Sequence, residues 1–313
     1  MDVAAPILKS ALLPPAPLYD EPLASLLEPI AFQPQPDTEN LGPAARSWPA
    51  AVALKLSILL AVHNQKATIA QAISDILNVD YPCAIQLIVV DDGSTDGTYE
   101  LLAQIGDDRV AVFRHRVPRG KSAALRTASD LATGSYLLAF DGGPEYSAED
   151  IPRMLRPVLA GRCQVVYGAR LPGHNTLYRS RRRVRGNRLL TLLANVLFDA
   201  CVTDLHTGFK LMPKAIFDEL VLRERGVGLD TEMTALLLKR GVRPFEVPVS
   251  YYGGPASTAK EISWRQAAAC VRILLRVRLR TGVAGRLHRR PVHDRAYSSD
   301  VICSDHPNLS EAC

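Results

Sequence analysis

Two short acidic clusters contain the residue types with the clearest chemical potential. In Asp91-Asp92-Gly93-Ser94, two carboxylates could accept hydrogen bonds from a ribose or a base. The following Asp96-Gly97-Thr98 turns the chain towards a helix. A capping turn uses the same residue types, so a purely structural role for this cluster stays open.

The second cluster is Asp141-Gly142-Gly143-Pro144-Glu145. Asp141 and Glu145 could hold one hard divalent cation, because Mg²⁺ and Mn²⁺ prefer carboxylate oxygens and bridge to phosphates. Such a cation neutralises a departing diphosphate as its bond to a sugar breaks. The alternative is a solvent-exposed acidic turn.

The pattern of apolar residues around the clusters predicts an α/β fold. A near-continuous apolar run at 54–62 is typical of a strand buried on both faces. Further strands are expected at 86–90, 110–113, 136–140, 165–167 and 242–251, with an extended stretch at 204–211. Helices are expected at 69–77, 98–104, 120–131, 148–159, 186–202, 231–238 and 264–279. This alternation predicts a mostly parallel sheet with helices on both faces. Both acidic clusters follow strands, at the edge where such sheets bind ligands.

Two other nucleotide-binding patterns are not supported. Arg119-Gly120-Lys121-Ser122 looks like the end of a P-loop, but His115 stands where that loop requires its first glycine. The first strand is not followed by the glycine pattern of dinucleotide-binding oxidoreductases.

Composition limits the protein class and divides the chain. With 313 residues, 47% of them hydrophobic and 22% charged, it is neither wholly disordered nor collagenous nor coiled-coil. Residues 1–50 hold 10 of the 22 prolines and carry a net charge of −4, so the rest carries +9. No apolar run reaches the roughly 18 residues of a membrane span. Without a signal-peptide pattern, and with six cysteines lacking metal-site spacing, we expect a cytoplasmic protein with reduced thiols.

The segment 91–98 resembles the VDDGSxDGT nucleotide-binding motif of family 2 glycosyltransferases, which have the GT-A fold. Other segments resemble further motifs of the family, in order: Gly120-Lys121 (NxGKGxAL), 140–150 (QDADLEYxPxD), 165–170 (VVYGSR), 186–190 (GNRLL), 203–210 (TDxxTGFR/K), 230–232 (ExE), 247–251 (EVPISY), and Lys260 with Trp264 (KKIxW). The resemblance covers about residues 55–275. It is strongest to the dolichyl- or polyprenyl-phosphate mannosyltransferase-like branch.

The resemblance implies a GT-A-type nucleotide-sugar-binding domain and an inverting hexosyltransferase. Its donor would be GDP-mannose or a UDP-hexose, its acceptor a polyprenyl or dolichyl phosphate, and its cofactor Mg²⁺ or Mn²⁺. The implied site residues are Asp141, Asp230 and Glu232 for catalysis, His63, Gln65, Asp92 and Lys121 for the donor, Arg170, Arg185 and Lys260 for phosphate, and Asp141 with Glu145 for the metal. A hydroxyl acceptor would require Asp230 or Glu232 as general base, whereas a phosphate acceptor is already an anion.

Several positions depart from the family pattern. Gly143 replaces the second acid of the D-x-D metal motif, and Gln65 replaces an acid after the first strand. Pro118-Arg119 and Gly253-Gly254 also differ from the usual residues. The missing acid predicts weaker metal binding. Transfer to a glycan or lipid hydroxyl, and a weakly active or non-catalytic nucleotide-sugar-binding homologue, therefore remain alternatives.

Arginines gather in two stretches, at 179–188 and along an amphipathic helix from Trp264 to Arg280. They could belong to a solvated loop and a helix packed on the domain. No nucleic-acid recognition motif accompanies them. Arginine clusters and amphipathic helices bind anionic lipid surfaces, so we expect peripheral contact with an anionic membrane and no nucleic-acid partner. The expected organisation is a disordered proline-rich tail at 1–50, a GT-A domain at 52–255, a basic amphipathic extension at 256–290 and a disordered tail at 291–313.

Overall fold

The computed structural model describes residues 54–140, 143, 145–170, 176–177, 181–253, 263–280 and 301–303. For 181–183 and 301–303 it describes the backbone alone. Two predicted site residues, Asp141 and Lys260, lie outside the described residues, as does the predicted tail at 1–50.

An eight-stranded sheet forms the centre of the fold, in the order β10-β3-β2-β1-β4-β7-β5-β8. Its strands are β1 (Lys55–Val62), β2 (Ala84–Asp91), β3 (Val110–His115), β4 (Tyr136–Phe140), β5 (Val166–Ala169), β7 (Lys210–Pro213), β8 (Phe245–Pro248) and β10 (Val301–Cys303). Strands β1 to β4 are parallel to one another, as are β5 and β8, whereas β7 runs antiparallel between β4 and β5. The carboxyl ends of β1, β2 and β4 therefore lie at one edge, where the first acidic cluster begins.

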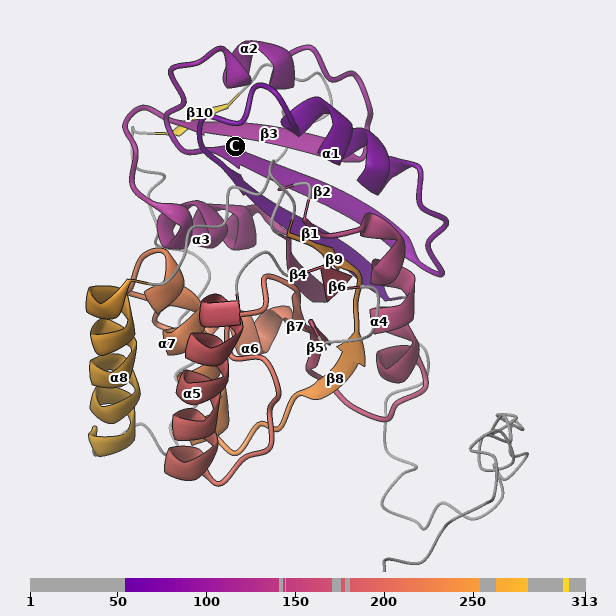
Figure 1. The fold of residues 1–313 in the computed structure, drawn as a ribbon. Helices are drawn as coiled ribbons and strands as arrows, with labels where there is room; N and C mark the ends of the chain where they lie inside the picture. The colour runs from indigo at the N-terminus through magenta and orange to yellow at the C-terminus, as the bar shows by residue number, and fades with distance from the viewer. Residues whose placement is uncertain are drawn as a thin grey trace, which may run out of the picture. The chain divides into compact units, whose positions relative to one another are not determined.

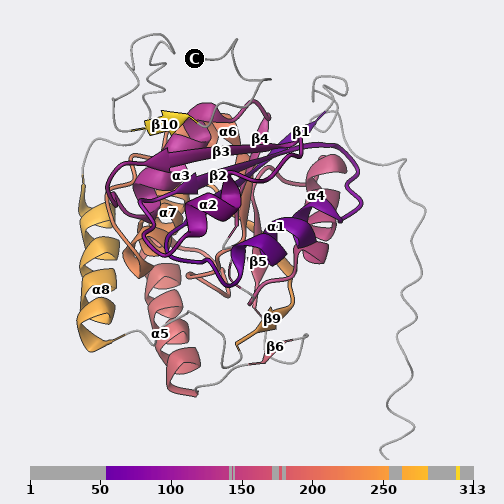
Figure 2. The same cartoon turned by 90° about the horizontal axis from the view of Figure 1, so that it is seen from above.

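Helices cover both faces of this sheet (Figures 1 and 2). They are α1 (Ile69–Leu77), α2 (Thr98–Leu102), α3 (Lys121–Leu131), α4 (Ile151–Leu159), α5 (Arg181–Phe198), α6 (Lys214–Asp218), α7 (Val227–Lys239) and α8 (Trp264–Leu279). A 3₁₀ turn at Ala148–Asp150 leads into α4, and β6 (Thr176–Leu177) pairs with β9 (Tyr251–Tyr252) in a separate ribbon.

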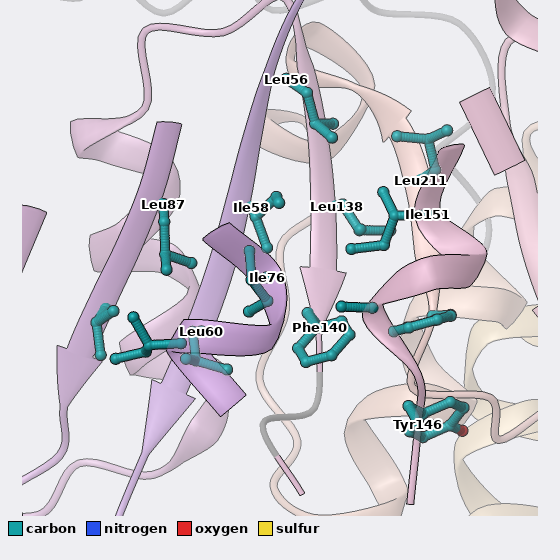
Figure 3. Close-up of a cluster of buried hydrophobic side chains, with 14 of the residues drawn as sticks. Leu56, Ile58, Leu60, Ile76, Leu87, Leu138, Phe140, Tyr146, Ile151 and Leu211 are labelled. Atoms are coloured by element: carbon teal, nitrogen blue, oxygen red, sulfur yellow. The ribbon is translucent and has the colours of Figure 1, made fainter. Parts of the chain in front are cut away.

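Alternation along the central strand divides the core between the two faces. Leu56, Ile58 and Leu60 point into a cluster with residues of α1 and α4, shown in Figure 3, whereas Leu59 points into a cluster with α3 and α7. All four leucine and isoleucine side chains are fully buried, as a strand covered on both faces requires. A third apolar cluster joins α5, α7 and α8 beside the sheet.

The predicted α/β class and the mostly parallel sheet are confirmed, and several details differ. Helix α5 begins at Arg181, five residues before the expected start, and α6 was not expected. In the stretch 204–211 only the end is strand, because side-chain hydrogen bonds hold the preceding loop. Strand β10 falls in the stretch 291–313, for which we expected no regular structure.

Candidate active site

Asp92 begins the site at the carboxyl end of β2. Its carboxylate contacts His115 Nδ1 at 2.7 Å and accepts hydrogen bonds from the backbone N–H groups of Arg119 at 2.8 Å and Gly120 at 2.6 Å. Burial alone would raise the pKa of Asp92, but these hydrogen bonds outweigh it and hold the pKa below its usual value. Asp92 is therefore ionised, and it fixes the loop that leads into α3.

Asp91, by contrast, is bound on all sides by groups of the protein itself. Its fully buried carboxylate accepts hydrogen bonds from the Ser94 N–H at 3.2 and 3.3 Å and pairs with Arg114 Nε at 3.2 Å. Between them, Gly93 has a φ of 69°, and a Cβ at this position would lie 2.8 Å from Pro118 N. Asp91 thus stabilises the turn, in line with the capping alternative, and the turn requires glycine at position 93.

The predicted donor residues after β1 lie beside this turn. His63 is exposed, and its Nδ1 lies 2.9 Å from the backbone oxygen of Asp92. The N–H of Gln65 donates to Thr98 Oγ1 at 3.0 Å, while its side-chain Oε1 is buried without a hydrogen-bond partner. An unsatisfied buried acceptor is costly, so Gln65 Oε1 could accept a hydrogen bond from a ligand.

Lys121 links this edge of the sheet to α7. It begins α3 directly after Gly120, and its charge helps to lower the pKa of Asp230. Asp230 also pairs with the buried Lys210 Nζ at 2.9 Å. Burial acts in the opposite direction, but Lys210 and Lys121 keep the pKa of Asp230 below its usual value. Asp230 is consequently a weakly basic carboxylate in a positively charged setting.

Glu232 lies two residues further along α7 and has a full set of partners. Its Oε2 accepts hydrogen bonds from the N–H groups of Arg223 at 2.7 Å and Glu224 at 2.9 Å. Its Oε1 pairs with Arg276 of α8 at 3.0 Å. These contacts attach the loop before α7 and the helix α8 to one buried carboxylate, which favours a positioning role over that of a base.

Arg170 follows β5 and forms an ion pair with Asp204. Its Nε and Nη2 donate to the two carboxylate oxygens at 2.6 and 2.8 Å, and its guanidinium lies 5.1 Å from the centre of the Tyr251 ring. Burial alone would raise the pKa of Asp204, but Arg170 holds it far below its usual value. This desolvated bidentate pair leaves Arg170 bound to protein rather than presented to a phosphate.

The same network continues from Asp204 towards α7. Asn187 of α5 donates to Asp204 at 2.9 Å and contacts His206 Nδ1 at 2.7 Å. On its other side, His206 Nε2 lies 2.8 Å from Thr231 Oγ1. Burial lowers the pKa of His206 to about 4, so this ring is neutral at physiological pH. The network links β5, α5 and α7 through fully paired polar groups.

Glu145 occupies the space that the family's second metal-binding acid would need. Its Oε2 lies 1.9 Å from the position of an ideal Cβ on Gly143, so the carboxylate folds back over the glycine. Glu145 is buried, at 4% exposure. Among the described residues no group of three or more His, Cys, Asp or Glu side chains could hold a metal ion, and Asp141 lies outside them. The carboxylate of Glu145 therefore fits the place of the absent aspartate side chain.

The structure brings the four predicted donor residues to one edge of the sheet and reveals partners that the sequence did not indicate. Around the ends of β1 and β2 lie His63, Gln65, Asp92 and Lys121. The charge of Lys121 also acts on Asp230 of α7. Arg185 is exposed near the start of α5. The unexpected partners are Arg114, His115, Asn187, His206, Lys210 and Arg276. Lys210 was visible in the TGFK segment and Asn187 in GNRLL, whereas no local signal pairs His115 with Asp92.

The model of the family described as "Glycosyl transferase family 2" matches residues 57–221, which run from within β1 to beyond α6. The chain belongs to this family. It is also similar to a glycosyltransferase, AglJ, of Haloferax volcanii, with 31% identity over 199 residues that cover 63% of each chain. A polyprenol monophosphomannose synthase of Mycolicibacterium smegmatis is 24% identical over 62% of this chain and 76% of its own.

Solved structures show the same fold. A mannosyl-3-phosphoglycerate synthase from Rubrobacter xylanophilus has a TM-score of 0.58 and 22% identity, covering 76% of this chain and 78% of its own. A mannosyltransferase from Pyrobaculum calidifontis, solved with GDP-Man and Mn²⁺, has a TM-score of 0.52 and 18% identity, covering 77% and 70%. The match spans 63% of AglJ and 48% of a second Haloferax volcanii relative, the hexosyltransferase Agl6.

Proposed function

We propose that this family 2 protein is an inverting glycosyltransferase that moves a hexose from a nucleotide-sugar to a polyprenyl phosphate at a membrane surface. The donor would be GDP-mannose or a UDP-hexose, since relatives of similar fold carry GDP-Man or UDP-Glc in their structures. The similarity to a polyprenol monophosphomannose synthase supports the lipid-phosphate acceptor.

The observation that carries the choice of acceptor is the state of the two acids on α7. An efficient general base has a pKa near the working pH. Asp230 has a lowered pKa because Lys210 and Lys121 stabilise its charge, and both oxygens of Glu232 are already bound. Neither acid is arranged to remove a proton from a hydroxyl. A phosphate acceptor is already an anion near neutral pH and needs no such base.

The reaction would be a single in-line displacement. An oxygen of the acceptor phosphate attacks the anomeric carbon of the sugar, while the bond from that carbon to the diphosphate breaks. The electron pair leaves with the nucleoside diphosphate, and the anomeric configuration inverts. Lys121 and Arg185 would offset phosphate charge, and Asp92 would hold the loop that carries Lys121. The carboxylates of Asp141 and Glu145 would hold Mn²⁺ or Mg²⁺, which supplies positive charge to the departing diphosphate.

Isothermal titration of GDP- and UDP-sugars, with and without Mn²⁺, tests the donor side of this proposal. We expect binding of one donor that tightens with Mn²⁺, and transfer of its labelled sugar to a polyprenyl phosphate. Donor binding without any transfer to phosphate or hydroxyl acceptors would instead support a non-catalytic binding protein, which the substitution at Gly143 would explain. An absence of donor binding would reject both.

A further inference from the structure

Helices α5 and α8 expose large apolar side chains that the described part of the chain leaves uncovered. On α5, Leu189, Leu192 and Val196 are exposed at 68%, 59% and 72%. On α8, Trp264, Leu275 and Leu279 are exposed at 75%, 41% and 74%. These six are half of the large apolar side chains that are exposed in the described part of the chain.

Each set forms one stripe on its helix. At 3.6 residues per turn, Leu189, Leu192 and Val196 fall on about the same third of the α5 circumference, together with the exposed Arg185 and Arg188. The buried Leu190, Ala194 and Phe198 occupy the opposite side. Both faces of α5 are thus apolar, and its outer face also carries basic side chains.

Helix α8 has the same arrangement. Trp264, Leu275 and Leu279 share an outer face that is bordered by the exposed Arg265 and Arg272. The inner face, with Cys270, Ile273, Leu274 and Val277, packs into the cluster that also contains the inner faces of α5 and α7. Figures 1 and 2 both show α5 and α8 side by side, and their inner faces share one buried cluster.

The positive charge of this surface favours an anionic partner. Neither α5 nor α8 contains an aspartate or a glutamate, and arginines stand in both. We propose that the outer faces of α5 and α8, defined by Leu189, Leu192, Val196, Trp264, Leu275 and Leu279, dock the protein in the interface of an anionic lipid bilayer. Apolar side chains enter the acyl boundary, and the flanking arginines bind the anionic headgroups. In the described residues no helix is long and apolar enough to cross a bilayer.

The two helices that carry this surface also contact the polar network of the candidate active site, through their inner faces. Asn187 of α5 contacts Asp204 and His206, and Cys270 Sγ of α8 lies 3.9 Å from His206 Nε2. A bilayer bound to the two helices would therefore meet the domain close to the polar network of the site. The inference deepens the proposed function, because it names the surface through which a lipid acceptor would be reached.

The test uses the full chain with vesicles of phosphatidylcholine, alone or mixed with phosphatidylglycerol. Trp48→Phe leaves Trp264 as the single tryptophan of the chain. We expect binding to the mixed vesicles, a blue shift of Trp264 emission and its quenching by brominated lipid. Leu192→Ser should weaken binding roughly tenfold and Arg272→Gln about fivefold. Leu159→Ser, which removes an exposed leucine from α4, is the matched control and should leave binding unchanged.

Equal binding by Leu192→Ser and by wild type, or unquenched Trp264 fluorescence in bound protein, would overturn the inference. So would a dimer in lipid-free solution that Leu192→Ser dissociates, because the surface would then be covered by a second copy. Transfer to a short, water-soluble prenyl phosphate separates the two proposals. Vesicle binding without any transfer rejects the proposed function alone, and transfer without vesicle binding rejects the docking surface alone.

Discussion

Substitution of Gly143 tests whether the carboxylate of Glu145 has taken the place of the missing metal-binding acid. An ideal Cβ on residue 143 would lie 1.9 Å from Glu145 Oε2, whereas real contacts of this kind are essentially never under 3.0 Å. Gly143→Ala must therefore push the buried carboxylate away by about 1 Å or more, although it removes no ligand and adds no charge. The obstructing atom is the far end of a flexible side chain, so the cost in stability should fall below the about 1–3 kcal/mol of a small-to-large change in a packed core.

We expect Gly143→Ala to lower the melting temperature by about 2–4 °C per kcal/mol of this cost. It should also weaken Mn²⁺ binding, measured by titration calorimetry, as much as Glu145→Gln does. In Glu145→Ala the obstruction is absent, so adding Gly143→Ala to that variant should have little further effect. The double-mutant cycle should give a coupling energy of about 0.5–3 kcal/mol.

Gly143→Asp tests the same position with a side chain that can bind a metal ion. If residue 143 were simply an empty ligand position, restoring the aspartate alone would tighten Mn²⁺ binding. We expect a gain only when Glu145→Ala accompanies it, because otherwise two carboxylates compete for one space. A stabilised Gly143→Ala protein with unchanged Mn²⁺ affinity, or additive effects at the two positions, would show that Glu145 does not occupy the place of the missing acid.

Three further predictions concern the polar groups of the site. In the wild type, the free energy of unfolding should fall by up to about 3 kcal/mol between pH 6.5 and 4, because the unfolded state takes up a proton that the buried His206 ring, with a pKa of about 4, does not. His206→Gln should abolish this decrease. Urea unfolding at several pH values should therefore show a flatter profile for the variant than for wild type. Asp204→Asn should lower the free energy of unfolding by about 3–5 kcal/mol, because the buried guanidinium of Arg170 loses its bidentate carboxylate partner. Asp218→Asn, at a more exposed pair, should cost less than about 1 kcal/mol, and equal losses in both variants would contradict this assignment. Glu232→Gln should change kcat less than tenfold while lowering the melting temperature, whereas a loss of about 10²–10⁴ in kcat would identify Glu232 as the base.

The sequence was sufficient for the architecture because its signals are local. The continuous apolar run of β1 and the periodic apolar positions of α1 predict their elements within one or two residues. Parallel order then follows from the alternation, and it places the acidic clusters at one edge. The start of α5 was missed because six arginines precede and enter it, and charge on an exposed helix turn looks like a loop.

The arrangement inside the site depended on contacts between distant segments. Asp92 was expected to face a nucleoside, but its carboxylate binds His115 and the α3 loop, which lie at least 23 residues away. Arg170 was expected to face phosphate, but Asp204 binds it bidentately across 34 residues. No residue pattern in one sequence specifies such pairings. The roles assigned to Asp141 and Lys260 stay predictions, because both lie outside the described residues.

The proposed function requires that the acceptor is a phosphate rather than a hydroxyl. A competition between a polyprenyl phosphate and the polyprenol of the same length, with a labelled nucleotide-sugar and Mn²⁺ in one reaction, measures it in a single experiment. We predict that the label enters only the phosphate-linked lipid, and that this selectivity persists in Glu232→Gln. Label in the polyprenol, lost in Glu232→Gln, would contradict the account and show that α7 supplies a general base.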